Sequence, residues 1–478
     1  MAYFLKKTKL KNRTYLAIYE SFYNHAKKAT AHKCFQSLGS VETLMEHGIK
    51  DPISHFQKEV DELNRKKKEA GTRKISEKSS ILYLGYFPLK NIMDKLNIKK
   101  YVDFFKFTHD FEFDLFELIS SLVYARSVNP CSKNKTFHEV IPNLYHSYSY
   151  SYDQLLGGLA FLGSNYEKFI EIFTTQVGNI YGIDTSKTYF EIGRTDEHRK
   201  KEPTVGVGLL LDRHQIPVGM KMYPGNESDK PILSDVLHYL KKQNNIKGKT
   251  IHVADKGLDC AQSIAFAKRN GDGYLFSKSV NGLSEKEKAW ILPDHDFKER
   301  KDKSGNILYR YKSCIDQFPY TAEYEGKTVT LNLTEKRLLT YNPAHLLITS
   351  EIEMTDQDIY DTYHNLWRTE GLSMMQSDFN ASPVFLQKED TVKGHFLICY
   401  LTVLLERILQ FKVLKNKYPA SEICNFIRNF KVTKADNKYI NATTYSDFID
   451  DLSKLFDLPL TNYFLTEPQI KSMFNRKL

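Results

Sequence analysis

At positions 250–258 the sequence is Thr250-Ile-His-Val-Ala-Asp-Lys-Gly-Leu258. Its first five residues form a short, mostly apolar run that Gly257 interrupts, and this pattern predicts a buried strand. Such a strand leaves the carboxylate of Asp255 at its exposed end. The fold expected for the rest of the chain is built around this strand.

Two further carboxylates are expected beside Asp255. Asp184 follows the apolar run Asn179–Ile183, which predicts a second strand with a carboxylate at its end. Glu370 ends the segment Asp356–Glu370, where apolar residues recur at helical spacing. A single strand-end carboxylate is usually only a solvated residue, so the prediction depends on all three acids meeting in one pocket.

Three converging carboxylates predict a site for two hard divalent cations, because such ions prefer oxygen ligands. The expected ions are two Mg²⁺, with Mn²⁺ as a substitute. A pair of this kind activates a nucleophile and stabilises the leaving oxygen of a phosphodiester. Asp184, Asp255 and Glu370 therefore predict metal-dependent phosphoryl transfer on DNA.

The elements around Asp255 are predicted in the order of a known architecture. Two apolar runs joined by the polar turn Asp212–Gln215 predict an antiparallel hairpin. Three antiparallel strands followed by helix, strand, helix and strand form an RNase H-like fold, an α/β architecture with its sheet between helices. The predicted strands are 189–192, 205–211, 216–223, 250–254 and 273–277, and the predicted helices are 231–243 and 261–269.

The chain is long enough for several domains, and shifts in its pattern place their boundaries. A β-rich insertion, with short strands at 307–311, 320–324 and 328–333, is expected to interrupt the catalytic core. The expected regions are a basic N-terminal region with a hairpin and a helix (1–78), a helical DNA-binding domain (79–176), the first part of the RNase H-like core (177–283), the β-rich insertion (284–347), the second part of the core with the Glu370 helix (348–410) and a C-terminal helical tail (411–478).

Positive charge is concentrated at the start of the chain. Residues 1–78 contain 17 Lys or Arg and 9 Asp or Glu, so they supply +8 of the net charge of +10. A concentrated positive segment fits a phosphate-backbone partner such as double-stranded DNA. The candidate contacts there are Arg65, Lys66, Lys67 and Lys68. Lysines at the end of a helix also complement the helix dipole, so a solvated lysine-rich face is the alternative.

The overall composition, with 41% hydrophobic and 26% charged residues, is that of a globular protein. No apolar run reaches about 18 residues, so no membrane span is expected. The first seven residues do not have the order of a secretory signal. The six cysteines are widely spaced and form no CxxC pair, which predicts reduced thiols rather than disulfides or a zinc site.

Several blocks of sequence occur in a characteristic order. They are Met1–Lys7, Ser37–Leu44, Val128–Lys133, Asp153–Gly163, Asp184–Ile192, Pro224–Asp229, Val253–Leu258 and Tyr363–Glu370. In this order, over nearly the whole chain, they resemble the DDE transposases of prokaryotic insertion sequences of the IS4 type, and among these the IS1634 group. The resemblance implies that Asp184, Asp255 and Glu370 are the three catalytic, metal-binding acids.

The resemblance also implies the activity and the partners. The expected reaction is cleavage at the terminal inverted repeats of an insertion sequence, followed by transfer of the freed 3′ hydroxyl into target DNA. A homodimer is expected to pair the two ends, in the prokaryotic cytoplasm and in association with the nucleoid. Four residues are further candidates for DNA contact: Lys256, Trp290, Tyr363 and Arg368. The alternatives are a surface role for Lys256 and core packing for Tyr363.

The sequence departs from the family pattern at two positions of the Tyr363–Glu370 signature. Leu366 stands where an Arg is usual, and Ser377 stands where a Lys is usual. Two segments, near Lys201 and before Thr349, are also shorter than in the group. Two alternatives therefore stay open: a catalytically weakened or inactive derivative that binds element ends, and a hydrolytic nuclease with an RNase H fold.

Overall fold

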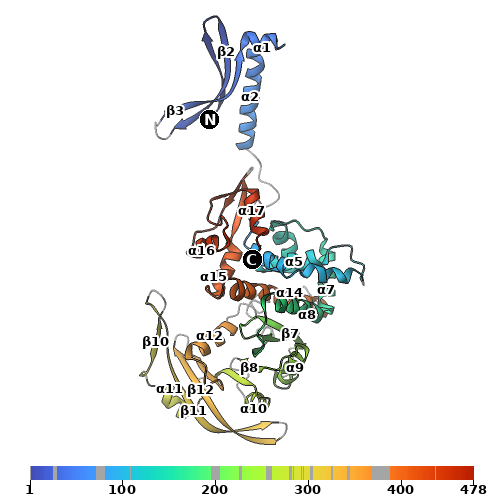
Figure 1. The fold of residues 1–478 in the computed structure, drawn as a ribbon, viewed down its shortest axis with the longest axis vertical. Coiled ribbons are helices and arrows are strands. Elements are labelled where there is room, and N and C mark those ends of the chain that lie inside the picture. Colours follow the sequence, from blue (N-terminus) through green and yellow to red (C-terminus); the bar gives the residue numbers. More distant parts are fainter. Residues whose placement is uncertain are drawn as a thin grey trace. The chain divides into compact units, whose positions relative to one another are not determined.

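The computed structural model describes most of the chain in two compact units, Met1–Ser79 and Ser80–Leu478 (Figure 1). The described residues are 2–24, 29–71, 81–107, 109–194, 205–224, 229–254, 261–278, 283, 285–291, 293, 295–301, 305–324, 327–341, 345–367, 388–435 and 438–477.

The first unit is a three-stranded antiparallel sheet beside a long helix. The sheet has the order β1-β2-β3, with β1 (Tyr3–Leu10), β2 (Arg13–Asn24) and β3 (Ala29–Ser40). The helices are α1 (Val41–Glu46) and α2 (Pro52–Gly71). The predicted hairpin and the predicted helix are thus confirmed, and β3 extends the hairpin by a strand that the sequence did not predict.

The second unit is a mixed α/β structure built on a nine-stranded sheet, with the order β10-β11-β12-β13-β9-β8-β5-β6-β7. In its central part, β5 pairs antiparallel with β6 and parallel with β8, and β8 pairs parallel with β9. The predicted strands and the predicted β6–β7 hairpin are confirmed. The elements are β5 (Lys187–Arg194), β6 (Val205–Leu211), β7 (Pro217–Pro224), α9 (Asp229–Gln243), β8 (Lys249–Ala254), α10 (Ala261–Arg269) and β9 (Gly273–Lys278).

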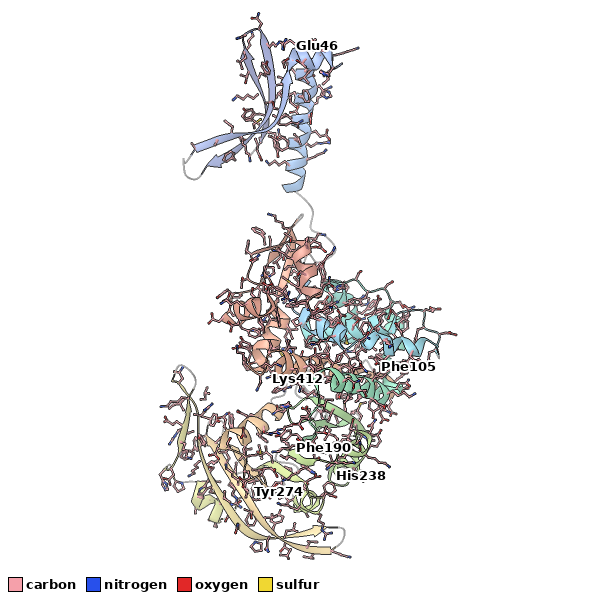
Figure 2. All side chains as sticks on the ribbon, viewed as in Figure 1. Glu46, Phe105, Phe190, His238, Tyr274 and Lys412 are labelled. Atoms are coloured by element: carbon pink, nitrogen blue, oxygen red, sulfur yellow. The ribbon has the colours of Figure 1, made fainter. Side chains whose placement is uncertain are left out.

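Side chains alternate between two apolar layers on opposite faces of this sheet. Tyr189 and Val253 face the larger core, which also contains residues of the surrounding helices. Phe190 and Tyr274, which are labelled in Figure 2, belong to the other core, together with residues of α9 and α10. The alternation places the sheet between two helical layers, because successive side chains of a strand point to opposite faces.

The predicted strand at 179–183 is wrong. The helix α8 (Tyr166–Tyr181) continues through most of that run and ends at Gly182, whose φ of 73° is a left-handed conformation. Phe169, Phe173 and Val177 recur along one buried stripe of α8. A short apolar run at the end of such a stripe extends a helix as readily as it forms a strand.

The insertion lengthens the same sheet. A long antiparallel hairpin pairs β11 with β12, and β13 joins this hairpin to β9. Residues 307–311 and 320–324 are in strand as predicted, but the predicted break between them is wrong, because both lie within β11, which pairs with β12 through Pro319 as well. The elements are α11 (Glu285–Ile291), β10 (Lys298–Lys301), β11 (Ile307–Tyr324), β12 (Lys327–Tyr341) and β13 (His345–Thr349).

The helical region and the C-terminal tail share one core. A four-stranded sheet with the order β16-β15-β14-β4 joins β4, near residue 82, to strands of the tail. The helices of this part are α3 (Phe87–Lys95), α4 (Ile98–Val102), α5 (Leu115–Val128), α6 (Lys133–Lys135), α7 (Tyr152–Ser164), α12 (Asp356–Trp367), α14 (Glu389–Arg407), α15 (Ala420–Asn429), α16 (Asp447–Phe456) and α17 (Glu467–Phe474), with the 3₁₀-helices η1 (Asp103–Phe107) and η3 (Ile141–Asn143) and the π-helices η2 (Thr136–Val140) and η7 (Ile408–Val413). Its strands are β4 (Ile81–Tyr83), β14 (Lys431–Ala435), β15 (Lys438–Asn441) and β16 (Phe464–Leu465).

Two expectations concern the chain as a whole. The described part of the chain contains no helix that is both long enough and apolar enough to span a membrane. The five described cysteines, Cys34, Cys131, Cys314, Cys399 and Cys424, form no disulfide with one another. Cys260 lies outside the described residues.

Candidate functional site

The central sheet has two edges where side chains gather. β5 and β8 run parallel, from the pair Lys187–Lys249 to the pair Glu191–Val253. We name the edge where these strands begin the strand-start edge, and the edge where β8 ends at Ala254 the strand-end edge. The six residues of β8 separate the two edges by roughly 17 Å, at about 3.3 Å per residue.

Asp184 lies at the strand-start edge, three residues before β5. Its Oδ1 accepts hydrogen bonds from the main-chain nitrogen of Ser186 (3.0 Å) and from the Ser186 hydroxyl. Its Oδ2 lies 3.9 Å from a guanidinium nitrogen of Arg213. The Ser186 hydroxyl, followed by the Ser186 main chain, lowers the pKa of Asp184, so this carboxylate is ionised at neutral pH.

Asp212 lies beside Asp184 and is fully buried, with 0% of its surface exposed. Its Oδ1 accepts from the main-chain nitrogens of His214 (2.8 Å) and Ile216 (2.9 Å), and its Oδ2 accepts from that of Asp184 (3.3 Å). Burial raises the pKa of Asp212. Its oxygens are occupied by main-chain donors, so Asp212 holds the β6–β7 turn in place.

Two lysines and a glutamate complete the strand-start edge. Glu351 follows β13, and its carboxylate pairs with the ammonium groups of Lys249 and Lys187, the latter at 4.0 Å. Burial lowers the pKa of Lys187, and Glu351 opposes this effect. Glu351 therefore compensates part of the positive charge of the two lysines.

Of the three acids that are predicted to meet in one pocket, the structure describes Asp184 alone, so their meeting stays a prediction. Asp184 precedes β5 at the strand-start edge, whereas β8 ends at the opposite edge. Carboxylates that together hold two cations about 3.5–4 Å apart do not lie at opposite ends of a strand as long as β8. Asp255, Lys256, Arg368 and Glu370 lie outside the described residues. Among the residues that are described, no three His, Cys, Asp or Glu side chains gather as a metal site.

Two predicted DNA contacts are described in the second unit. Tyr363 is 1% exposed within the larger core, so it has no surface for a DNA contact, and the expected contact is corrected to core packing. Trp290 is half-buried against the other core, and the ammonium of Lys312 lies 5.5 Å from its ring centroid. Its exposed part is the surface available for base stacking.

The basic run at the end of α2 is engaged in local ion pairs. Lys66 lies 3.2 Å from Glu62, and Arg65 lies 3.9 Å from the same carboxylate. Lys67 lies 2.7 Å from Glu20 of β2 and over the ring of Tyr3. Lys68 belongs to α2, and its side chain is not among those described. These ion pairs neutralise part of the positive charge of the run within the first unit.

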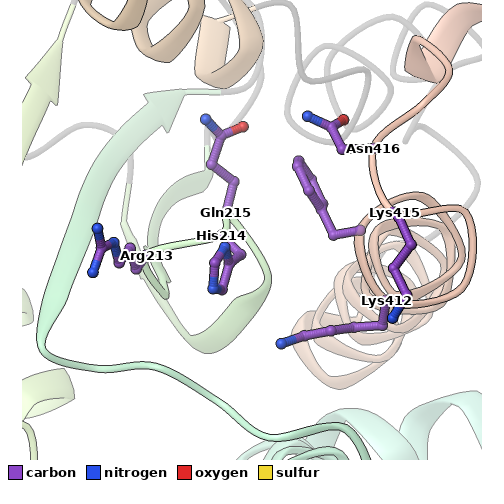
Figure 3. A pocket seen from close by; sticks show the side chains of 7 residues that line it. Arg213, His214, Gln215, Lys412, Lys415 and Asn416 are labelled. Atoms are coloured by element: carbon purple, nitrogen blue, oxygen red, sulfur yellow. The ribbon is translucent and has the colours of Figure 1, made fainter.

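A basic cavity was not predicted from the sequence. It has a volume of about 460 Å³ and is lined by Arg213, His214 and Gln215 of the β6–β7 turn and by Phe411, Lys412, Lys415 and Asn416 near the end of η7. Figure 3 shows the two groups facing each other. They are separated by about 200 residues, and no local pattern signals their meeting; only the polar turn at 212–215 was recognised.

No model of a known protein family matches the chain, and no curated protein sequence matches it. Among solved structures, the chain is similar to piggyBac transposase in a synaptic complex with hairpin DNA, with a TM-score of 0.34 and 11% identity over 73% of this chain and 79% of that chain.

Two endonuclease V structures are similar at lower scores. The enzyme of Ciona intestinalis, in complex with a DNA 24mer that contains an inosine, has a TM-score of 0.18 and 11% identity, over 26% of this chain and 64% of that chain. Human endonuclease V has a TM-score of 0.19 and 7% identity, over 42% of this chain and 87% of that chain. At these scores the similarities assign neither a fold family nor a function to the chain.

Proposed function

We propose that the chain is a DNA transposase that cleaves phosphodiesters and transfers the freed 3′ hydroxyl at the strand-end edge of the sheet. The observation that supports this most is the strand order β7-β6-β5-β8-β9. Three consecutive antiparallel strands lie on one side, and two strands parallel to β5 lie on the other. This is the strand arrangement of an RNase H-like core.

The strand order also supports a location for the proposed substrate site. In an open α/β sheet, ligands bind outside the carboxyl ends of strands at the point where the strand order reverses. The chain leaves β5 on one side through β6 and returns on the other side as β8. The reversal therefore lies between β5 and β8, and its carboxyl side is the strand-end edge.

Two of the proposed catalytic acids come directly or shortly after elements in this part of the structure. Asp255 comes directly after Ala254, the last residue of β8. Glu370 comes three residues after α12, whose Ile359 and Tyr363 are buried in the larger core beneath the sheet. These two residues are the proposed ligands from the central strand and from the helix.

The third proposed ligand comes from β5. Glu191 is the acidic residue within β5, and it pairs with Val253, one residue before the end of β8. Adjacent strands are about 4.8 Å apart, so the register favours Glu191 over Asp184 as the partner of Asp255. Asp184 is kept in the proposal as the competing assignment that the experiment below distinguishes.

Carboxylate oxygens suit hard divalent cations, and neighbouring strand ends suit a pair of ions about 3.5–4 Å apart. Asp255, Glu370 and the β5 acid would hold two Mg²⁺, with Mn²⁺ as a substitute, and such ions supply activation of water and stabilisation of the leaving oxygen. The role of the carboxylates would be to hold and position these ions, and the reaction needs no covalent bond between protein and DNA.

The proposed partners are the terminal inverted repeats and the target DNA, with a homodimer holding two ends. The strands of the first unit support a DNA partner. They contain five cations, Lys6, Lys7, Lys9, Arg13 and Lys33, and one acid, Glu20, which pairs with Lys67. The ammonium of Lys6 lies over the ring of Tyr19, a combination that contacts both phosphates and bases.

The test is strand cleavage and joining by the full-length chain. Duplexes that carry the inverted repeats flanking the gene are incubated with Mg²⁺ or Mn²⁺, and nicked and joined products are separated on denaturing gels. We expect Asp255→Asn and Glu370→Gln to reduce product at least 100-fold while DNA binding in EDTA is unchanged. Glu191→Gln is expected to do the same, and Asp184→Asn is expected to retain activity.

Each other outcome has a defined meaning. Loss of activity in Asp184→Asn but not in Glu191→Gln would reverse the assignment of the third ligand. Cleavage without joining would identify a hydrolytic nuclease. Binding to the repeats without any metal-dependent product would identify a non-catalytic derivative, and full activity of Asp255→Asn would reject the site.

A further inference from the structure

The basic cavity at the strand-start edge has walls that are held in place. On one side, Asp212 accepts the main-chain bonds that shape the β6–β7 turn, and Gln215 adopts a φ of 62°. On the other side, Lys415 and Asn416 adopt φ values of 55° and 54°. The main-chain nitrogen of Asn416 donates to the carbonyl of Gln410 at 2.8 Å. Two constrained turns therefore present the lining side chains.

The lining is positive and its charges are poorly compensated. It contains Arg213, Lys412 and Lys415 together with His214, and no acidic residue. Among the described residues, neither Lys412 nor Lys415 has an ion-pair partner, and Arg213 has a carboxylate oxygen of Asp184 at 3.9 Å. Positive side chains that line one cavity favour the binding of an anion in it, because the anion offsets the repulsion between them.

The polar groups suit a phosphate. Arg and Lys donate charge-assisted hydrogen bonds to phosphate oxygens, and the amides of Gln215 and Asn416 offer further donors on opposite sides of the cavity (Figure 3). Figure 3 also shows the Lys412 side chain extending toward the β6–β7 turn. The volume of about 460 Å³ accommodates a phosphate with part of its sugar.

We propose that this cavity binds a backbone phosphate of DNA at a position away from the cut. The identification of DNA as the ligand rests on the proposed function. The cavity adjoins the strand-start edge, and the length of β8, roughly 17 Å at about 3.3 Å per residue, separates that edge from the proposed site of cleavage. The cavity therefore binds DNA that flanks the reacting phosphodiester, where phosphate contacts position the duplex without reading its sequence.

The test is the salt dependence of duplex binding by the full-length chain in EDTA, measured by fluorescence anisotropy. The double variant Lys412→Gln/Lys415→Gln is compared with Lys417→Gln, an exposed lysine of the same turn that does not line the cavity. The slope of log Kd against log salt is expected to fall by about 0.9 for each phosphate that the double variant no longer neutralises, and to be unchanged in Lys417→Gln. Thermal unfolding monitored by circular dichroism confirms that both variants fold.

An unchanged slope in the double variant, or an equal decrease in Lys417→Gln, would overturn the phosphate assignment while leaving the proposed function intact. A reduced slope in a protein that makes no metal-dependent product would support the cavity and reject the catalytic proposal. A wild-type protein that does not bind duplex DNA would overturn both.

Discussion

Asp212 is a buried carboxylate whose ionisation is coupled to folding. Burial raises the pKa of Asp212, so the native state binds this proton more tightly than the unfolded state does. The stability from this group is complete below the unfolded pKa, about 3.9, and is lost as the pH rises through the raised native pKa. Asp184, whose pKa is lowered by Ser186, has the opposite sign: its contribution is present at high pH and is lost as the pH falls.

We therefore expect Asp212→Asn to gain stability relative to the wild type as the pH rises. The asparagine keeps an acceptor oxygen for the β6–β7 turn and carries no charge. The gain should be about 1.4 kcal/mol for each unit by which the native pKa exceeds the unfolded one. Urea unfolding at pH 4.5 and pH 7.5 measures it.

Asp184→Asn is the matched control for this measurement. Its stability relative to the wild type should stay nearly constant over the same rise in pH, because the pKa of Asp184 is lowered and its contribution changes mainly below the unfolded pKa of about 3.9. A free-energy difference between Asp212→Asn and the wild type that does not change with pH would contradict the coupling.

The candidate site shows how far single residues could be located from the sequence. Asp255 was identified because a short apolar run ended by glycine is a local signal, and β8 confirms that run as a strand. The sequence predicts a strand end at Asp184 because the mostly apolar run Asn179–Ile183 precedes it. The same residues continue the buried stripe of α8, and only packing distinguishes these two outcomes. The edge occupied by each acid depends on strand register, which has no local signature.

At the scale of elements, α7 and α14 are in close contact through glycines. A Cβ at Gly394 would lie 2.0 Å from the carbonyl oxygen of Leu159, and one at Gly163 would lie 1.7 Å from that of Asp390. The neighbouring atoms belong to the main chain and cannot rotate away. The two helices therefore approach through surfaces that have no room for a methyl group.

Gly394→Ala is expected to lower the free energy of unfolding by about 1–3 kcal/mol or more, as overpacking does. Gly157→Ala in α7 is the control, because a Cβ there meets nothing within 4 Å. This control should gain up to about 1 kcal/mol from the higher helix propensity of alanine. Chemical denaturation measures both changes, and equal effects would show that the helices are not in contact at these glycines.

The sequence predicts correctly those helices and strands that have a pattern within a few consecutive residues. It does not predict those whose conformation depends on pairing with a distant strand. The β6–β7 hairpin and the helices α9 and α10 follow from periodicity over a few residues. The single strand β11 was expected as separate pieces, because Pro319 and polar residues interrupt its alternation. Pairing with β12 across its whole length overrides that interruption. β3 was missed for a similar reason, since its polar sequence becomes a strand by pairing with β2.

For the second unit as a whole, the last helix is part of the core. Phe474 of α17 is 1% exposed. The centroid of its ring lies 5.0 Å from that of Tyr86 and 4.9 Å from that of Tyr145, both in the helical region. Glu467 accepts hydrogen bonds from the hydroxyls of Tyr145 and Tyr439. The tail therefore completes a core that begins near residue 82, which no local sequence pattern indicated.

We expect Phe474→Ala to lower the free energy of unfolding by about 3–5 kcal/mol, the range for truncation of a buried phenylalanine. Phe464→Ala is the control from the same tail, because its side chain is 51% exposed, and it should change stability by about 0.5 kcal/mol or less. Guanidinium unfolding measures both. Similar values for the two variants would show that the end of the chain does not belong to the core.

The pairing of β4 with β14 joins Tyr83 to Lys431, about 350 residues later in the chain. A ribosome that adds about 5–20 residues per second delivers the second partner roughly 20–70 s after the first. During this time, the apolar helices between the two strands lack their final packing partners. The apolar surface that they expose is the kind of surface that chaperones bind. The first unit closes within its own 79 residues and has no comparable delay.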